Sequence, residues 1–340
     1  MAIFKEEHHD KTLKSVLKKS EKALIDYNDL GIVFTPEHIV ELICDLVELK
    51  KEDKVFDPAC GTGNILVVAQ HNVNGDISNY YGCELREDLS IVAKSSLCSE
   101  NIYNWDFMKL DVDAMLLKNF TVGIMNPPYS LAKSKETANM SELSFVRRLL
   151  SCLRHGARCA VIVPLSTMVG KTTDDKKIKD HIIRSHTLEG VISLNKNTFY
   201  GVGTNTCIAI FTAHYPHPKD KVCKFINFED DGWAVSKHIG LTKTETADEK
   251  RKRLIDCWLH GQQAETKFMV QTPIEYGDEW LHSFYYFNDE IPTDADFEKT
   301  IADYLTFEFS MIMQGRGYLF ENNDDEKSVV DQPKVASLFD

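Results

Sequence analysis

Short apolar runs alternate with segments of helix length through the middle of the chain. The runs lie at residues 55–56, 80–85, 122–125 and 158–164, with a weaker one just before Asp106. Such alternation is typical of βαβ units. It predicts an α/β fold built on a mostly parallel, twisted sheet.

Two further apolar runs, at residues 188–194 and 206–212, lie only about a dozen residues apart. Gly201 and Gly203 fall between them and favour a direct return of the chain. The pair therefore predicts an antiparallel hairpin at the edge of the sheet. Residues 222–228 predict one more strand.

The two ends of the chain differ in pattern from the middle. Residues 230–265 are polar and charged, a helix is expected around residues 296–312, and the last twenty residues are expected to be loose. The pattern predicts three parts: an N-terminal helix at residues 1–30, a main domain at 31–230 and an acidic C-terminal segment at 231–340. The N-terminal helix is Lys-rich and amphipathic, with an apolar side formed by Leu13, Val16, Leu17, Leu24 and Ile25.

The start of the main domain contains a helix signal. Thr35 precedes Pro36, and an apolar stripe follows at helical spacing. Threonine is a favoured capping residue and proline is favoured at the first helical position. We therefore expect Thr35 to cap a helix that begins at Pro36.

The composition narrows the class of protein. No apolar run approaches the roughly 18 residues of a membrane span, and the first residues lack the apolar core of a secretory signal. The nine cysteines are scattered, without a Cys-x-x-Cys pair or a His/Cys cluster at zinc spacing. We expect reduced thiols, a cytoplasmic protein and no metal site.

The charge is unevenly distributed. The net charge is −13, but residues 274–340 carry 16 Asp and Glu against 4 Lys and Arg, which leaves residues 1–273 close to neutral. Residues 141–190 carry nine Lys and Arg against five acidic residues. The main domain can therefore present a basic face to nucleic acid, although scattered solvated side chains explain the same count.

The stretch Asn126-Pro127-Pro128-Tyr129 follows a predicted buried strand. Two consecutive prolines stiffen the turn and remove two backbone donors, which leaves its carbonyls free to accept hydrogen bonds. The Asn side chain adds an acceptor and the Tyr ring adds a flat face. An exocyclic amine on a planar ring would find here two acceptors and a platform, although Asn-Pro-Pro is also a common turn.

Acidic and glycine residues follow the preceding strands. Residues 57–63 (Asp-Pro-Ala-Cys-Gly-Thr-Gly) join a strand to a helix, and Asp57 suits a ligand that carries positive charge. Glu84 can accept both hydroxyls of a ribose, while Asp106 can accept from an adenine amino group with Phe107 packed on the base. Carboxyl ends of parallel strands meet at one edge, so these groups indicate an adenosine cofactor with a positive centre, S-adenosylmethionine.

On these residues the chain resembles the N6-adenine DNA methyltransferases of restriction-modification systems, most closely the modification subunit of type I systems. The matching elements are Phe34-Thr35-Pro36, residues 57–63, Glu84, Asp106-Phe107 and residues 126–129, in that order. The resemblance covers about residues 30–230. It implies a Rossmann-like class I S-adenosylmethionine-dependent methyltransferase fold.

The resemblance also implies roles for the matching residues. Asn126 and the carbonyl of Pro127 would take the two hydrogens of the target amine, and Tyr129 would stack on the flipped base. Phe199 falls where the family often places a second aromatic residue against that base. S-adenosylmethionine would be held by Thr35, Asp57, Ala59, Gly61, Gly63, Glu84, Asp106, Phe107, Asn126 and Pro128.

The activity implied is methylation of the N6 amino group of adenine in double-stranded DNA after base flipping, as the modification component of a bacterial or phage restriction-modification system. Two alternatives stay open. Asn-Pro-Pro-Tyr also serves methyltransferases that act on rRNA or on a protein glutamine amide. In the second alternative, the chain is a non-catalytic DNA- or partner-binding module that retains the fold.

Partners follow from what the chain lacks relative to the family. Type I modification subunits normally carry a long helical domain before the Phe-Thr-Pro element, whereas some thirty residues precede it here. The segment after residue 230 is short and acidic for a target-recognition domain. We expect a separate specificity subunit, and a second methyltransferase copy or a restriction subunit as further partners, with the Lys-rich helix and the acidic segment as docking surfaces.

Overall fold

The computed structural model describes residues 34–129, 141–199, 203–236, 240–288 and 294–313. One compact unit extends through Phe287, and a second begins at Asn288. Helix α11 (Asp294–Met313) belongs to the second unit and confirms the helix expected there. The predicted N-terminal helix and the predicted loose C-terminus lie outside the described residues.

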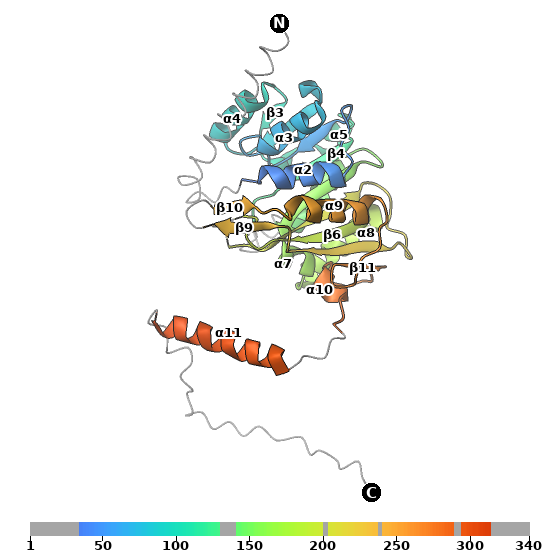
Figure 1. Ribbon diagram of the computed structural model, residues 1–340. Helices are drawn as coiled ribbons and strands as arrows, with labels where there is room; N and C mark the ends of the chain where they lie inside the picture. The colour runs from blue at the N-terminus through green and yellow to red at the C-terminus, as the bar shows by residue number, and fades with distance from the viewer. Residues whose placement is uncertain (1–33, 130–140, 200–202, 237–239, 289–293, 314–340) are drawn as a thin grey trace, which may run out of the picture. The chain divides into compact units, whose positions relative to one another are not determined.

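The described part of the first unit contains a nine-stranded sheet (Figure 1). Its strands follow the order β11-β8-β6-β7-β5-β4-β1-β2-β3. The half from β5 to β3 is parallel throughout, while β7 runs antiparallel to both β5 and β6. The strands are β1 (Val55–Asp57), β2 (Tyr80–Glu84), β3 (Ile102–Asn104), β4 (Val122–Met125), β5 (Arg158–Pro164), β6 (Thr187–Leu194), β7 (Thr206–Thr212), β8 (Cys223–Phe228) and β11 (Met269–Thr272).

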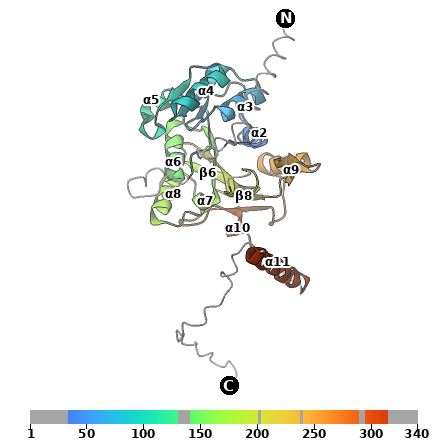
Figure 2. The same cartoon turned by 90° about the vertical axis from the view of Figure 1, so that its left-hand side faces the viewer.

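Helices cover both faces of this sheet. Figure 2 shows α2, α3 and α9 on one side and α5, α6 and α8 on the other. The two faces bury separate apolar clusters, so strand residues contribute to them alternately: Ala160 and Ile162 belong to one cluster, and Val161 and Val163 to the other. The helices are α2 (Glu37–Leu46), α3 (Asn64–Val73), α4 (Glu87–Leu97), α5 (Val112–Leu116), α6 (Glu142–Cys152), α7 (Leu165–Val169), α8 (Thr173–Ser185), α9 (Ala247–Leu259) and α10 (His282–Tyr285).

The predicted α/β fold with a mostly parallel sheet is confirmed, and so is the antiparallel hairpin formed by β6 and β7. Its predicted place at the sheet edge is wrong. Strand β8 pairs in parallel with β6, and β11 pairs with β8. Strand β6 is buried along nearly its whole length, which is typical of a strand with neighbours on both sides.

The predicted cap of helix α2 is also wrong. The helix begins at Glu37, Pro36 takes the N-cap position, and no side chain caps it. The Thr35 hydroxyl instead accepts a hydrogen bond from the side chain of Asn126. A tertiary partner has replaced the local one that the sequence suggests.

The composition shift at residue 230 predicts a boundary, but the chain beyond it packs on the same unit. A hairpin of β9 (Trp233–Ser236) and β10 (Gly240–Lys243) leads into α9, which lies beside α2 (Figure 1). The Trp258 indole donates to the carbonyl of Leu46 at 3.0 Å. Arg251 pairs with Glu41 and Asp45 of α2. Helix α9 is therefore polar in overall composition but has one face buried against α2.

In the described ranges, no helix is long and apolar enough to cross a membrane.

Candidate active site

The carboxyl ends of the parallel strands bring the predicted residues to one edge of the sheet. Asp57 ends β1, Glu84 ends β2, and Asn126 directly follows β4. Strand β1 pairs with both β2 and β4, so these three positions are neighbours in space. Asp106 comes two residues after β3, which is next to β2.

The glycine turn between β1 and α3 depends on two left-handed residues. Gly61 has φ +54° and Gly63 has φ +83°, a region that side-chain-bearing residues rarely adopt. A Cβ added at Gly63 would lie 3.2 Å from Ala93, whereas one at Gly61 would meet no atom within 4 Å. Gly63 thus permits close packing of α3, and the Cα of Gly61 faces open space that a ligand can approach.

Asp57 is a buried carboxylate with one unused oxygen. Its Oδ1 accepts from the Ala59 amide at 3.0 Å, while the buried Oδ2 has no partner among the described residues. Burial raises the pKa of Asp57 to about 8, and the nearby charge of Glu84 adds to the increase. A cationic ligand would both pair with Oδ2 and stabilise the ionised form. The residue fits the positive end of S-adenosylmethionine.

Glu84 is held by backbone amides from two sides. Its Oε2 accepts from Gly61 N and its Oε1 from Arg86 N, each at 2.9 Å. Each carboxylate oxygen keeps a second lone pair. The fixed carboxylate therefore suits a pair of ribose hydroxyls beside the glycine turn.

Asp106 and Phe107 have different surroundings: Asp106 makes polar contacts, and Phe107 packs in the core. The Asp106 side chain accepts from the Met108 amide at 2.9 Å and pairs with the exposed Lys109 at 3.4 Å. The Phe107 ring is buried and lies edge-on to Phe56, with ring centres 6.1 Å apart. The structure gives Phe107 a core contact, and its contact with a cofactor base stays a prediction.

Asn126 is held at both ends of its carboxamide. Its Nδ2 donates to the Thr35 hydroxyl at 3.1 Å, and its Oδ1 accepts from the Tyr129 hydroxyl at 2.6 Å. Burial raises the pKa of Tyr129, which keeps that hydroxyl a donor. No described residue donates to the carbonyl of Pro127. Among the described residues, one acceptor therefore has no partner, and the other accepts from the hydroxyl of the residue expected to stack on the base.

The remaining predicted site residues differ in exposure. Pro127 is buried and Pro128 is exposed at the turn. Phe199 is 4% exposed and belongs to the same apolar cluster as α2 and α3. Its contact with a flipped base stays a prediction.

Several basic residues of the segment 141–190 serve the fold rather than an open surface. Arg148 donates to the Phe107 carbonyl at 2.7 Å, and Arg158 pairs with the buried Asp53 at 2.6 Å. Lys179 is buried, donates to the Asp278 carbonyl at 2.6 Å and has its pKa lowered by burial to about 8. These three cations are therefore not available for the basic face that the sequence suggests.

Sequence reasoning missed three residues beside the site. Asn64, the first residue of α3, donates from Nδ2 to the Thr35 carbonyl at 2.7 Å. Leu85 follows Glu84 and is 66% exposed, and Trp105 precedes Asp106 and is 57% exposed. Large exposed apolar side chains next to the two carboxylates suit a planar, partly apolar ligand. Their adjacency to those acidic residues was the available sequence signal.

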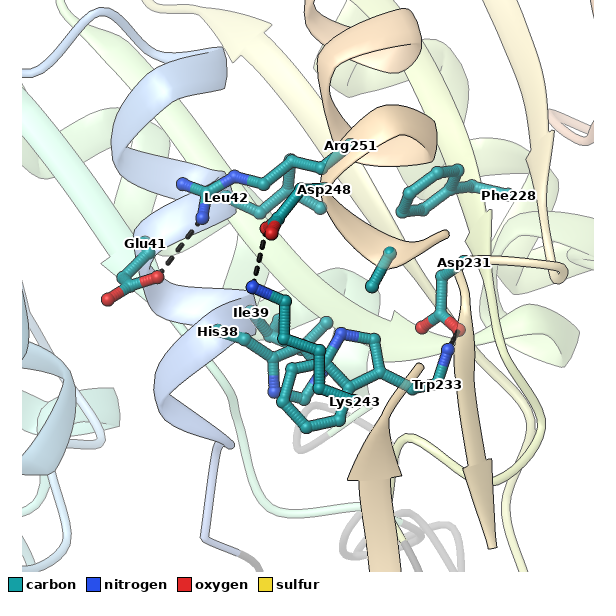
Figure 3. A pocket seen from close by; sticks show the side chains of 11 residues that line it. His38, Ile39, Glu41, Leu42, Phe228, Asp231, Trp233, Lys243, Asp248 and Arg251 are labelled. Carbon is teal, nitrogen blue, oxygen red and sulfur yellow. Dashed lines mark hydrogen bonds and ion pairs between the residues drawn. The ribbon is translucent and has the colours of Figure 1, made fainter. Parts of the chain in front are cut away.

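A small cavity of about 70 Å³ lies beside the first two turns of α2 (Figure 3). His38 stacks on Trp233 there, with ring centres 3.9 Å apart. Burial and then the charge of Arg251 lower the pKa of His38 to about 4, so the ring is neutral. Asp231 accepts from the Trp233 amide and from Asn195 at the end of β6. The lining of the cavity thus comes from both α2 and the β9–β10 hairpin.

Within the described ranges, no three His, Cys, Asp or Glu side chains are grouped so as to hold a metal ion.

Comparison with known proteins identifies the family to which the chain is similar. The model of the N-6 DNA methylase family matches residues 21–305. The chain is 43% identical over 318 residues to the type II restriction enzyme and methyltransferase RM.BcgI of Heyndrickxia coagulans, covering 89% of this chain and 50% of that protein. It is 25% identical over 311 residues to the type I restriction enzyme MjaVII methylase subunit of Methanocaldococcus jannaschii, covering 82% and 53%.

A solved structure shares the fold. The methyltransferase subunit of a type I restriction-modification system from Streptococcus thermophilus aligns with a TM-score of 0.58 at 19% identity, covering 71% of this chain and 56% of that one. The chain spans about half the length of the curated relatives it matches.

Proposed function

The chain belongs to the N-6 DNA methylase family, and from this membership we propose that it transfers a methyl group from S-adenosylmethionine to the N6 amino group of adenine in DNA. One observation carries the proposal. Asn126 and the Pro127 carbonyl follow β4. The neighbouring strand β1 ends in Asp57, and β2 on its other side ends in Glu84. Two acceptors for an amine thus adjoin carboxylates that fit a cationic adenosine ligand.

The cofactor would be held by residues of the first two strand ends. Asp57 Oδ2 is a buried acceptor without a described partner, Glu84 presents a fixed carboxylate, and the Cα of Gly61 faces open space. When bound, S-adenosylmethionine supplies a methyl group attached to a positively charged sulfur. Ionised Asp57 would balance the positive charge of the ligand.

The catalytic contribution of the chain is to hold and polarise the target amine. Asn126 Oδ1 and the Pro127 carbonyl would each accept one N–H, which draws the amine toward tetrahedral geometry and localises its lone pair. The same acceptors stabilise positive charge that grows on nitrogen during attack. Positioning of the amine for in-line attack supplies the rest of the acceleration.

Access to the amine requires that adenine leave the duplex. Unstacking costs a few kcal/mol, and stacking on an aromatic side chain repays about 1–3 kcal/mol. Tyr129 lies three residues after Asn126 and would supply that face. Its hydroxyl competes with the amine for Asn126 Oδ1, the oxygen to which it donates in the free protein.

For assembly, the acidic helix α11 is the docking element we propose for a separate specificity subunit. The helix carries five acidic residues and one lysine. It also exposes large apolar side chains, among them Phe297, Ile301, Leu305 and Ile312. Two copies of such a helix repel each other, whereas a basic amphipathic helix complements both its charge and its apolar surface.

The substrate class is tested by offering the full chain three acceptors with labelled S-adenosylmethionine: DNA free of methyladenine, ribosomes and a soluble protein extract. The label should enter DNA, and nucleoside digestion should release N6-methyldeoxyadenosine. Label confined to rRNA or protein contradicts the proposal. The docking proposal is tested by the same DNA assay with and without a specificity subunit. A variant in which Phe297, Ile301 and Leu305 are changed to Ser tests the part played by α11.

A further inference from the structure

Thr35 makes hydrogen bonds both to the helix start after the glycine turn and to the side-chain amide of Asn126. Its carbonyl accepts from Asn64 Nδ2 at 2.7 Å, and its hydroxyl accepts from Asn126 Nδ2 at 3.1 Å. Thr35 is only 4% exposed. The three residues come from separate elements: the segment before α2, the start of α3 and the end of β4.

The local backbone explains why the Thr35 carbonyl is available. A residue before proline is disfavoured in the helical region. Helix α2 accordingly uses the Pro36 carbonyl for its first bonds, at 3.0 Å to Ile39 N and 3.2 Å to Val40 N. The Thr35 carbonyl lies outside the helix and requires a partner because it is buried. Asn64 supplies that partner.

The hydroxyl of Thr35 accepts from the Nδ2 end of the Asn126 amide, which leaves the Oδ1 end for the substrate. The Oδ1 partner, Tyr129, competes with the target amine for that oxygen when a base enters. Among the described residues, Thr35 is then the partner that stays on the amide. With Nδ2 engaged by Thr35, Oδ1 is left to accept from the target amine. A reversed amide would oppose its own N–H groups to those of the amine.

We propose that Thr35 and Asn64 are positioning residues for methyl transfer: Asn64 anchors the Thr35 backbone to the glycine turn, and the Thr35 hydroxyl orients the Asn126 carboxamide. This inference rests on the proposed function. It assigns to Thr35 an action on the catalytic amide, in addition to any contact with the cofactor, and to Asn64 an action through Thr35.

The activity test compares Thr35→Val, Thr35→Ser and Asn64→Ala. Loss of the partner of a half-buried amide should lower kcat of Thr35→Val by about 10- to 100-fold, and Asn64→Ala by about 2- to 10-fold. Thr35→Ser retains the hydroxyl and should stay within about threefold of wild type. The double variant Thr35→Val/Asn64→Ala should lose less than the product of the single losses, because both act on one chain of bonds.

Two matched controls make similar bonds away from the site. Thr187 donates its hydroxyl to the Tyr215 carbonyl at 2.8 Å, and Asn101 donates to the Ser78 carbonyl at 3.0 Å. Thr187→Val and Asn101→Ala should leave kcat unchanged. If Thr35→Val changes only the Kd for S-adenosylmethionine and not kcat, Thr35 is a cofactor contact and the positioning role is refuted.

A second readout needs no methyl transfer, so it separates this inference from the proposed function. The Asn126 side-chain NH₂ signal, assigned by its absence in Asn126→Ala, should exchange slowly with solvent in wild type and Thr35→Ser. It should exchange at least about tenfold faster in Thr35→Val. Equal exchange in all three proteins would overturn the inference, whether or not the chain methylates DNA.

Discussion

The hydrogen bond between Tyr129 and Asn126 yields a prediction that separates two uses of one side chain. In the free protein the Tyr129 hydroxyl donates to Asn126 Oδ1 at 2.6 Å, the atom that the target amine needs. Tyr129→Phe removes this hydroxyl and keeps the ring. The target amine then no longer competes with this hydroxyl for the oxygen, so DNA should bind more tightly.

The size of the effect follows from the bond and the ring. A hydrogen bond of this kind contributes about 0.5–1.5 kcal/mol net, because water can take over at a half-buried acceptor. Tyr129→Phe should therefore lower KM for DNA by about 2- to 10-fold with kcat retained. Tyr129→Ala also removes the stacking face, worth about 1–3 kcal/mol per base, and should raise KM by about 5- to 100-fold relative to Tyr129→Phe.

The assay is initial-rate methylation of a duplex that carries the site found by sequencing cellular DNA, with the specificity subunit present. Cofactor affinity is measured in parallel and should be unchanged in both variants. A Tyr129→Phe enzyme with strongly reduced kcat would refute the reasoning, since the hydroxyl would then act in the reaction itself.

Three further predictions concern charge, stability and the cofactor pocket. Burial raises the pKa of Asp57 to about 8, and a cationic ligand needs the ionised form. Calorimetry should therefore show that the affinity for S-adenosylmethionine rises about tenfold per pH unit below pH 8 and levels above it. Asp57→Asn should bind weakly and without this pH dependence, and an equal slope in that variant contradicts the assignment. Asp53→Ala leaves Arg158 without its carboxylate partner and should lower the free energy of unfolding by about 3 kcal/mol in urea, whereas a loss below about 0.5 kcal/mol would show the pair to be dispensable. Trp105 is exposed next to Asp106, so cofactor binding should change its fluorescence; a change of the same size in Trp105→Phe would place the signal elsewhere.

Much of the fold follows from local pattern. The apolar runs at residues 122–125, 158–164 and 206–212 coincide with β4, β5 and β7. The position of β6 inside the sheet depends on non-local pairing with β8, which no local pattern contains. The polar composition of α9 likewise concealed the face that packs on α2.

The candidate site divides in the same way. Parallel strands bring their carboxyl ends to one edge, so the grouping of Asp57, Glu84 and Asn126 could be predicted. The orientation of each side chain could not. Thr35 appears in sequence as a helix cap, yet its hydroxyl is bound by Asn126, 91 residues away. Phe107 turns its ring into the core, where it lies edge-on to Phe56.

The central claim is tested most directly by Asn126→Ala in the cells that carry the gene. Genomic DNA is sequenced for N6-methyladenine from a deletion strain complemented with the wild-type chain, with Asn126→Ala, or with Gln263→Ala, an exposed carboxamide after α9. We predict methylation at one defined sequence with the wild type and Gln263→Ala, and none with Asn126→Ala, although that variant still binds S-adenosylmethionine. Full methylation by Asn126→Ala would contradict the account.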